Sequence, residues 1–289
     1  MKKLINPIIL FVKGIIMGLA NVIPGVSGGT LALIMGVYEK MINAITTLFK
    51  KFKENILFLL PLAIGMVAAI YGGSKVIPPC LEKFPLATVL FFVGLILGGM
   101  PMLYKKVSKH LKNWSNYLVL IIIFAALLCY TFLVGNGGKE DLTKLNFLDY
   151  IKLLLVGMVA AATMIIPGIS GSMTLMVLGY YEGIFETVGN ITNFSEFGHN
   201  MKILIPFGIG VVIGIFLIAK LIEFLLAKFE VKTYFGIFGF IFASLIIMFI
   251  KNVYAFNLIE FIVGLVLLVI GYFVSYFIAN YKKEEKIIE

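Results

Sequence analysis

The sequence predicts an all-α polytopic membrane protein built from two related halves, and three observations support this fold class. First, 61% of the 289 residues are hydrophobic and 13% are charged, whereas soluble domains usually carry roughly 25% charged residues. Second, the charges gather in short clusters, and the apolar runs between them are long enough to cross a hydrocarbon core about 30 Å thick. Third, a Pro-Gly-(Val/Ile)-Ser-Gly motif occurs twice, each time inside an apolar region.

The first half, residues 1–145, begins with an apolar region that is interrupted in its middle. Region 7–47 contains Asn-Val-Ile-Pro-Gly-Val-Ser-Gly-Gly at 21–29, so it predicts a broken or re-entrant helical hairpin rather than one continuous helix. Three uninterrupted apolar stretches follow, and each predicts a transmembrane helix: 56–77, 86–104 and 117–134.

The second half, residues 146–289, has the same order of segments. Region 152–188 is interrupted by Ile-Pro-Gly-Ile-Ser-Gly-Ser at 166–172 and predicts a second hairpin. The predicted transmembrane helices that follow are 203–226, 234–250 and 258–279. Because lipid cannot bond the backbone groups that such breaks release, protein or water must line both breaks.

The two halves are related by an internal duplication. Residues 14–45 align with 157–188 without a gap at an offset of 143, with nine identical positions. In so hydrophobic a chain, matched Pro, Gly, Ser and Glu carry more weight than apolar matches. The identities are Gly14/Gly157, Ile23/Ile166, Pro24/Pro167, Gly25/Gly168, Ser27/Ser170, Gly28/Gly171, Gly36/Gly179, Tyr38/Tyr181 and Glu39/Glu182. At an offset of 145 the alignment continues with Pro61/Pro206, Gly65/Gly210, Lys75/Lys220, Phe84/Phe229, Thr88/Thr233 and Gly94/Gly239.

The lysines predict the orientation in the membrane. The chain has a net charge of +9 and no arginine. If each interrupted region enters and returns on one side, the lysines at 2–3, 50–53, 105–112, 228–232 and 282–286 all face inward, as the positive-inside rule requires. Both termini are then cytoplasmic, and three spans per half insert the second half upside down. Such inverted halves with broken helices are typical of alternating-access transporters. A re-entrant hairpin and a pair of full spans both return the chain to the side from which it entered. The lysine distribution therefore does not distinguish these two forms of the interrupted regions.

The two breaks are predicted to form one composite anion site near the middle of the membrane. Ser27 and Ser170 are suitable N-cap residues for the half-helices that follow. The first amides of each half-helix would then lie at the positive end of a helix dipole, where anions bind without arginine. These amides belong to Gly28, Gly29 and Thr30 in the first half and to Gly171, Ser172 and Met173 in the second. The alternative is that both breaks are packing kinks, since Gly and Pro are common in membrane helices.

Four ionisable residues are candidates for gates or ion coupling. Glu39 and Glu182 occupy matched positions beyond the two breaks, and either could carry a proton. Lys75 and Lys220 are matched near the far end of the next span. At a rise of about 1.5 Å per residue, Lys75 falls at the outer depth of Glu182, and Lys220 falls at the inner depth of Glu39. We therefore expect these two pairs as gates or headgroup contacts, with interfacial snorkelling as the alternative.

The sequence offers little support for other chemistries. The two histidines, His110 and His199, fall in polar loops, which argues against acid–base catalysis and against a metal site. We therefore expect no cofactor and no metal. Cys80 and Cys129 have no metal or redox spacing. The lysines flank apolar spans, so we expect membrane lipids and not nucleic acid as their partners.

The paired breaks resemble those of the bacterial polyprenyl-phosphate transporter family, and the resemblance covers essentially the whole chain. It rests on the block at 18–30 and its partner at 166–172. It implies a flippase that returns undecaprenyl phosphate, the lipid carrier of cell-wall synthesis, from the outer to the inner leaflet of the cytoplasmic membrane. The substrate-binding residues that it implies are Asn21, Pro24, Gly25, Ser27, Gly28, Gly29 and Thr30, with Pro167, Gly168, Ser170, Gly171 and Ser172. The second block departs at Met164, opposite Asn21, and at Met173, opposite Thr30, so the half-sites need not contribute equally.

Two other functions stay open. The same dipole site could serve a transporter or channel for a small soluble anion, and a membrane-embedded phosphatase could act on the same lipid. A lateral groove would favour the lipid transporter, whereas a closed, water-lined pore would favour the small ion. A phosphatase needs a nucleophile and a general acid or base, against which the scarcity of histidine and the absence of arginine argue. The sequence fixes neither the coupling ion nor the oligomeric state.

Overall fold

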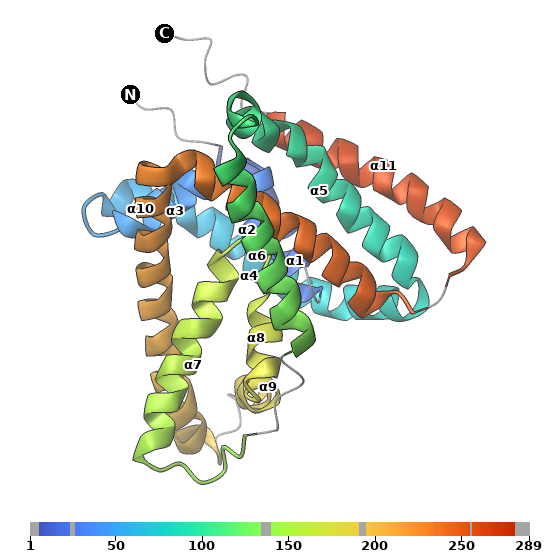
Figure 1. Cartoon of the computed structure of the whole chain (residues 1–289). Coiled ribbons are helices and arrows are strands. Elements are labelled where there is room, and N and C mark those ends of the chain that lie inside the picture. The colour runs from blue at the N-terminus through green and yellow to red at the C-terminus, as the bar shows by residue number, and fades with distance from the viewer. Residues whose placement is uncertain (1–5, 24–26, 134–139, 191–194, 255, 281–289) are drawn as a thin grey trace.

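The structure is a computed structural model that describes residues 6–23, 27–133, 140–190, 195–254 and 256–280. Within these ranges the regular elements are all helices (Figure 1), which confirms the predicted all-α class. They are α1 Pro7–Val22, α2 Gly28–Ile34, α3 Tyr38–Thr46, α4 Phe52–Lys83, α5 Pro85–Val107, the 3-10 helix Ser108–His110, α6 Trp114–Leu133, α7 Phe147–Ile165, α8 Gly171–Val177, α9 Tyr181–Gly189, α10 Phe197–Asn252 and α11 Leu258–Asn280. Six of the described helices are long and apolar enough to cross a membrane: α4, α5, α6, α7, α10 and α11.

The first hairpin consists of α1, α2 and α3. α1 begins at Pro7, which suits the first turn of a helix, and the Asn6 side chain accepts a hydrogen bond from the Ile8 amide at 2.9 Å. α2 has seven residues, a length of about 10 Å, so it cannot cross the hydrocarbon core a second time. Gly36 follows it with a φ of 67°, which glycine adopts without strain, and turns the chain into α3. These lengths favour the re-entrant form of the hairpin.

The second hairpin has the same three parts in α7, α8 and α9. A capping box begins α7, in which the Asn146 side chain accepts hydrogen bonds from the backbone and the Asp149 carboxylate accepts one from the Asn146 amide. α8 again has seven residues. Gly179, which the sequence matches to Gly36, follows it with a φ of 81°. The two hairpins therefore share their turn chemistry as well as their helix lengths.

The boundaries between the next two helices of each half also match. α4 and α5 meet at Phe84 (φ −138°, ψ 60°), and α10 bends at Phe229 (φ −133°, ψ 41°). The hydroxyl groups of Thr88 and Thr233 donate to the carbonyl oxygens of Phe84 and Phe229, at 2.8 and 2.9 Å. The expected spans 203–226 and 234–250 are thus joined by a bend inside α10. A straight helix of its 56 residues would be about 84 Å long, which exceeds any single membrane crossing.

Glycines set the packing of the first helix in each half. A β-carbon at Gly14 would lie 2.2 Å from the Leu62 carbonyl oxygen, and one at Gly157 would lie 2.2 Å from that of Phe207. No larger residue fits at either position, so α1 packs backbone to backbone on α4, and α7 packs in the same way on α10.

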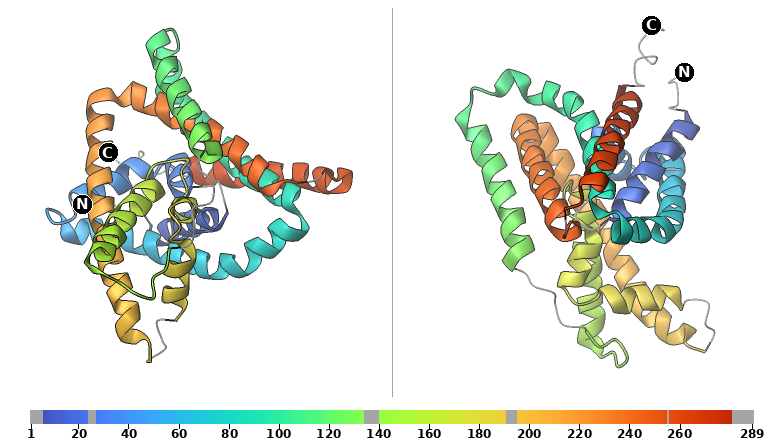
Figure 2. Two further views of the ribbon diagram at one scale, coloured as in Figure 1. Left: turned by 60° about the horizontal axis from the view of Figure 1, so that its bottom comes forward. Right: turned by 90° about the vertical axis from the view of Figure 1, so that its right-hand side faces the viewer.

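The remaining long helices pack across the two halves. α5 lies along α11, and α6 lies along the second part of α10 (Figure 1, Figure 2). β-Carbons at Gly94 and Gly98 would lie 2.1 and 2.2 Å from the carbonyl oxygens of Leu268 and Tyr272, so α5 and α11 are in close backbone contact. Each half therefore completes the packing of the other.

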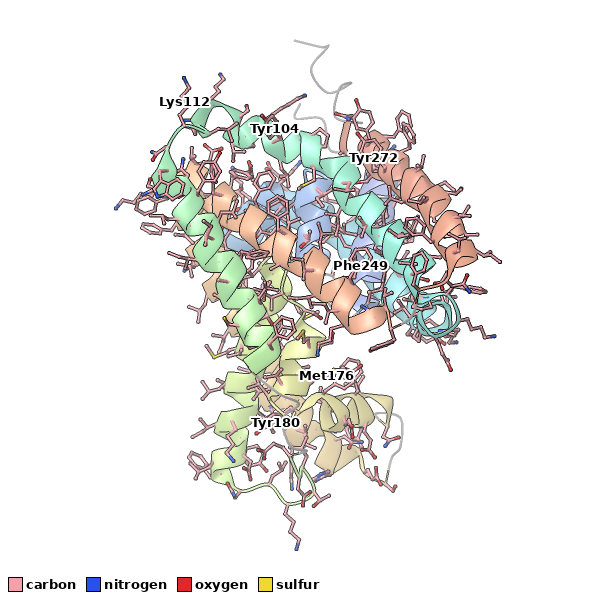
Figure 3. The ribbon with its side chains drawn as sticks, turned by 45° about the vertical axis from the view of Figure 1, so that its right-hand side comes forward. Tyr104, Lys112, Met176, Tyr180, Phe249 and Tyr272 are labelled. Atoms are coloured by element: carbon pink, nitrogen blue, oxygen red, sulfur yellow. The ribbon has the colours of Figure 1, made fainter. Side chains whose placement is uncertain are left out.

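The two hairpins differ in burial. Every residue of α2 is buried, and α2 contacts both α5 and α7. By contrast, α8 and α9 project from the body of the molecule with the lower part of α7 (Figure 1). Met176, which is 42% exposed, and Tyr180 lie in this projecting lobe, at the end of the molecule opposite to Lys112 (Figure 3). The structure is thus asymmetric despite the duplicated sequence.

Candidate functional site

The structure brings the end of α7 against the start of α2, so the regions of the two breaks meet. The Ser27 hydroxyl donates to the Ile166 carbonyl oxygen at 3.3 Å, and the Tyr38 hydroxyl donates to the Ile165 carbonyl oxygen at 3.2 Å. A β-carbon at Gly29 would lie 2.7 Å from the same Ile165 oxygen, so only glycine allows this approach. Each of these contacts joins one sequence half to the other.

In the first break the chain itself occupies the expected amides. The Gly28 amide donates to the Asn21 side-chain oxygen at 2.9 Å, and the Gly29 amide donates to the Ser27 hydroxyl oxygen at 3.2 Å. The Thr30 amide donates to the Ser27 carbonyl oxygen at 3.0 Å. Ser27 therefore caps α2, as its position in the sequence predicts. Each of these three N–H groups already donates a hydrogen bond within the chain, so none is free to bind an anion. The expected site residues Pro24 and Gly25 lie outside the described residues.

The Thr30 hydroxyl is a buried polar group without a partner. The residue has no exposed surface, and its oxygen makes no hydrogen bond to any part of the chain that the structure describes. An unpaired hydroxyl in such a place costs about 1–3 kcal/mol. Thr30 is one of the expected site residues, so this orphan group lies within the candidate site.

The second break leaves its amides open. The Ser170 hydroxyl pairs with the Ser172 hydroxyl at 2.8 Å and does not cap α8. Among the described residues, the amides of Gly171, Ser172 and Met173 find no acceptor. The second half-site thus presents a short row of backbone donors and two hydroxyl groups, which is the chemistry that an anion needs.

The departure at Met164 explains this difference between the breaks. The Asn21 side chain covers Gly28 and accepts its amide proton, whereas the Met164 side chain covers Gly171 and has no oxygen to offer. The turn before α8 depends on Gly168, whose φ is 88° and where a β-carbon would lie 2.7 Å from that of Phe240. The expected site residues of the second block are therefore grouped at one turn.

An apolar cavity of about 520 Å³ lies beside the second break, between α6 and the two parts of α10 that meet at the bend. Its lining includes Val119, Ile123, Pro167, Gly236 and Phe240. Among the described residues that line it, Lys232 is the one charged side chain. Such walls suit a hydrocarbon chain and would penalise a hydrated ion.

A charged cluster joins α3, α5 and α10 near the bend at Phe229. Lys106 Nζ lies 3.0 Å from Glu39 Oε1 and 3.2 Å from Glu230 Oε1. The Tyr234 hydroxyl donates to the same Glu39 oxygen. The charged side chains are between 38% and 56% exposed, so each ion pair contributes no more than about 1 kcal/mol. The cluster therefore adds little to the stability of the fold, but it fixes the relative positions of α3, α5 and α10.

The structure does not join the expected gate pairs by ion pairs. Within the described residues, no ion pair joins Lys220 to Glu39 or Lys75 to Glu182. Glu39 pairs with Lys106 because α3 packs against α10 close to the end of α5. Lys75 Nζ lies 3.3 Å from the hydroxyl of Tyr71, on its own helix, and 4.5 Å from the centre of that ring. Glu182 is exposed in the first turn of α9, and Lys220 is exposed on α10. Their roles as gates or coupling residues stay predictions.

Sequence reasoning misses two lysines that the structure makes prominent. Lys106 could have been found from the duplication, because at an offset of 145 it matches Lys251. Lys13 is only 4% exposed, and its Nζ donates to the Met35 carbonyl oxygen at 2.8 Å, at the C-terminal end of α2. A cation is favourable there, and a lysine inside an apolar segment is a signal in its own right. The matched position in the second half is Val156, so α8 lacks this restraint.

Comparison with known proteins identifies the family to which the chain belongs. The family described as undecaprenyl phosphate translocase-like matches residues 17–258. A polyprenyl-phosphate transporter of Staphylococcus aureus is 33% identical over 267 residues, which cover 91% of this chain and 93% of the relative. A polyprenyl-phosphate transporter of Vibrio cholerae is 31% identical over 245 residues, which cover 80% of this chain and 74% of the relative. No solved structure matches. The chain therefore belongs to the undecaprenyl phosphate translocase-like family.

Proposed function

We propose that the protein is a flippase that moves undecaprenyl phosphate across the bacterial cytoplasmic membrane for reuse at the inner leaflet. One observation carries this proposal: an apolar cavity adjoins a turn that presents unpaired hydrogen-bond donors. A lipid phosphate has the same two parts, an anionic head and a long apolar chain. The names of the Staphylococcus aureus and Vibrio cholerae relatives support this substrate class.

In this proposal the phosphate binds at the second break. The amides of Gly171 and Ser172 and the hydroxyls of Ser170 and Ser172 donate to its oxygens, and bonds to a charged acceptor are the stronger kind. Gly168 and Pro167 shape the turn that holds these donors. The first break is proposed as the facing wall, with the described residues Asn21, Ser27, Gly28, Gly29 and Thr30. Pro24 and Gly25 stay predicted site residues.

Transport would proceed by alternating access around the breaks. The two halves are oppositely oriented, both termini are cytoplasmic, and movement of the hairpins exposes the phosphate to each side in turn. The ion pair between Glu39 and Lys106 joins α3 to α5 at the proposed cytoplasmic end of the molecule, while α8 and α9 project at the proposed outer end. Glu39 and Glu182, with Lys75 and Lys220, are the proposed gate or coupling residues.

The alternatives fit the geometry less well. A small soluble anion would meet apolar walls beside the second break, which oppose a hydrated charge. A phosphatase would need a general acid or base at the site. His110 lies in the 3-10 helix after α5, His199 lies at the start of α10, and neither is among the described residues that line the cavity. We therefore propose a transporter and not an enzyme.

Reconstitution in liposomes tests the proposal. Polyprenyl phosphate in the outer leaflet is exposed to a membrane-impermeant phosphatase, and the protein should speed the exchange of lipid between the exposed and the protected leaflet. Ser170→Leu should slow this exchange at least about tenfold, since it removes donors to a charged group. Ser27→Leu should slow it as well, because it separates α2 from α7.

The matched control is Ser74→Leu on α4, where the exposed serine hydroxyl donates to the Tyr71 carbonyl oxygen of the same helix. This control should exchange lipid at the rate of the unaltered protein. Full activity in both the Ser27 and the Ser170 variants would overturn the proposed cradle. Phosphate release by the protein alone would identify a phosphatase, and faster efflux of inorganic phosphate would identify a soluble-anion carrier.

A further inference from the structure

The cavity between α6 and α10 has a charge pattern of its own. It extends along α10 from Phe240, beside the second break, to Lys232, next to the bend at Phe229. These two positions are eight residues apart, or about 12 Å along a helix. The other lining side chains are apolar apart from the hydroxyl groups of Thr233 and Tyr38, and both hydroxyls already donate to backbone carbonyl oxygens. Lys232 therefore stands alone as a cation at one end of an apolar groove.

Lys232 also differs from the lysine of the neighbouring cluster. Lys106 binds two carboxylates, whereas Lys232 makes no ion pair within the part of the chain that the structure describes. An exposed lysine at the head of an apolar groove is complementary to one anionic group that carries one apolar chain. In the orientation that the lysine distribution predicts, this end of the groove lies on the cytoplasmic side.

The matched helices of the first half, α5 and α11, leave no such groove. The groove therefore does not follow from the repeated fold alone. At an offset of 145, Phe91 stands where Gly236 stands, and Ala87 stands where Lys232 stands. A β-carbon at Gly271 would lie 2.4 Å from the Phe91 carbonyl oxygen, so α5 and α11 leave no gap there. A β-carbon at Gly236 would have ordinary contacts of 3.5 and 3.7 Å with Val119 and Ile123, so a side chain at this position would enter the groove.

We propose that this groove is a docking site for the substrate lipid at the cytoplasmic leaflet, with the isoprenoid chain between α6 and α10 and the phosphate at Lys232. This inference rests on the proposed function and adds a second binding position for the phosphate, besides the second break. The groove starts at Pro167 of the second break. A lipid whose phosphate leaves the break can therefore reach Lys232 while its chain stays in contact with the protein.

The chain-binding part is tested by photocrosslinking in liposomes. A polyprenyl phosphate with a photoreactive diazirine in its chain should label peptides from α6 and from the second part of α10. Gly236→Phe, which installs the residue of the matched position, should reduce this labelling about tenfold by filling the groove. Gly208→Phe is the matched control on α10, because a β-carbon there meets nothing within 4 Å. If Gly236→Phe does not fold, Gly236→Leu serves in its place.

The headgroup part is tested by binding. Lys232→Gln should weaken the binding of polyprenyl phosphate about tenfold, the loss expected for one bond to a charged group. It should leave the binding of the uncharged polyprenol unchanged. Lys112→Gln, which removes a lysine outside the groove, should bind both lipids as the unaltered protein does.

The two proposals fail in different ways. If the unaltered protein moves polyprenyl phosphate but the probe labels other helices, and Gly236→Phe and Lys232→Gln behave as the unaltered protein, the groove is not the docking site. If the unaltered protein moves no polyprenyl phosphate, the proposed function fails, whatever the labelling shows.

Discussion

At the scale of single residues, the two breaks differ chiefly by one side chain. Asn21 accepts the amide proton of Gly28, and Met164 leaves that of Gly171 open. The sequence alone shows the Asn/Met difference and predicts that the half-sites need not contribute equally. It does not show that Asn21 reaches back across the break, because that contact depends on how α1 and α2 fold together.

Exchanging this side chain tests which amides the substrate uses. Met164→Asn should place an acceptor over Gly171, raise the free energy of unfolding by about 1 kcal/mol as a helix cap does, and slow lipid exchange. Met164→Leu keeps the volume without the acceptor and should change little. Thermal unfolding and the liposome assay give the two readouts. Unchanged exchange in a stabilised Met164→Asn variant would show that these amides do not bind the phosphate.

Thr30 offers a second test, on stability alone. Thr30→Val removes a buried hydroxyl that has no partner and keeps the shape of the side chain, so it should raise the free energy of unfolding by about 1 kcal/mol. Thr30→Ser keeps the hydroxyl, loses a buried methyl group, and should lower the free energy of unfolding by about 1 kcal/mol. Both are measured by thermal unfolding. A destabilised Thr30→Val variant would mean that the hydroxyl has a partner after all.

At the scale of helices, apolar length and the Pro-Gly breaks predict most of the fold. The four expected spans 56–77, 86–104, 117–134 and 258–279 correspond to α4, α5, α6 and α11. The remaining two, 203–226 and 234–250, are joined within α10 by a bend at Phe229, which lies among the charged residues 228–232 that separate them in the sequence. The charges mark the boundary, and the match of Phe229 with Phe84, the residue after α4, shows that it corresponds to the break between α4 and α5. The sequence does not show that the backbone there stays helical on both sides of a bend.

The cluster around Lys106 should control how often α3, α5 and α10 separate at the end of the molecule that we propose to be cytoplasmic. Lys106→Gln removes two half-exposed ion pairs, and at about 0.5 kcal/mol for each pair the loss is about 1 kcal/mol. That loss corresponds to about fivefold more frequent opening. Leu103→Cys, at a position only 3% exposed next to the cluster, should therefore react about fivefold faster with a maleimide, in a background that lacks Cys80 and Cys129.

The neighbouring substitution Lys105→Gln is the control, because no ion pair to Lys105 exists among the described residues. Equal reaction rates in the Lys105 and Lys106 variants would show that the cluster does not restrain the inner end.

At the scale of the whole molecule, the proposed inversion of the halves gives a direct labelling test. Cysteines replacing Lys112 and Lys228 should react with an impermeant maleimide only after the cells are opened. Those replacing Thr143 and Lys202 should react in intact cells. All four residues are exposed, so reactivity reports sidedness. Labelling of Lys112 and Thr143 variants from the same side would contradict the inverted arrangement.

The groove is a property of the whole molecule that hydropathy does not predict. It exists because Gly236 stands where the first half has Phe91, and because α6 and α10 are less closely packed than α5 and α11. All of these segments are apolar, so their composition does not predict which pair of helices leaves a gap. Side-chain size at matched positions decides it, and that becomes visible only once the helices are paired in space.

The pairing of α5 with α11 and of α6 with α10 has a consequence for the history of the gene. Each pairing takes one helix from each half, so a chain with the length of one half would have left two helices without partners. The ancestor that was duplicated would therefore have worked as a homodimer, in which the contact now made by α5 and α11 and the one now made by α6 and α10 were the same contact, formed twice. Fusion of the two copies then allowed each to diverge, so that one has a gap at Gly236 where the other has Phe91.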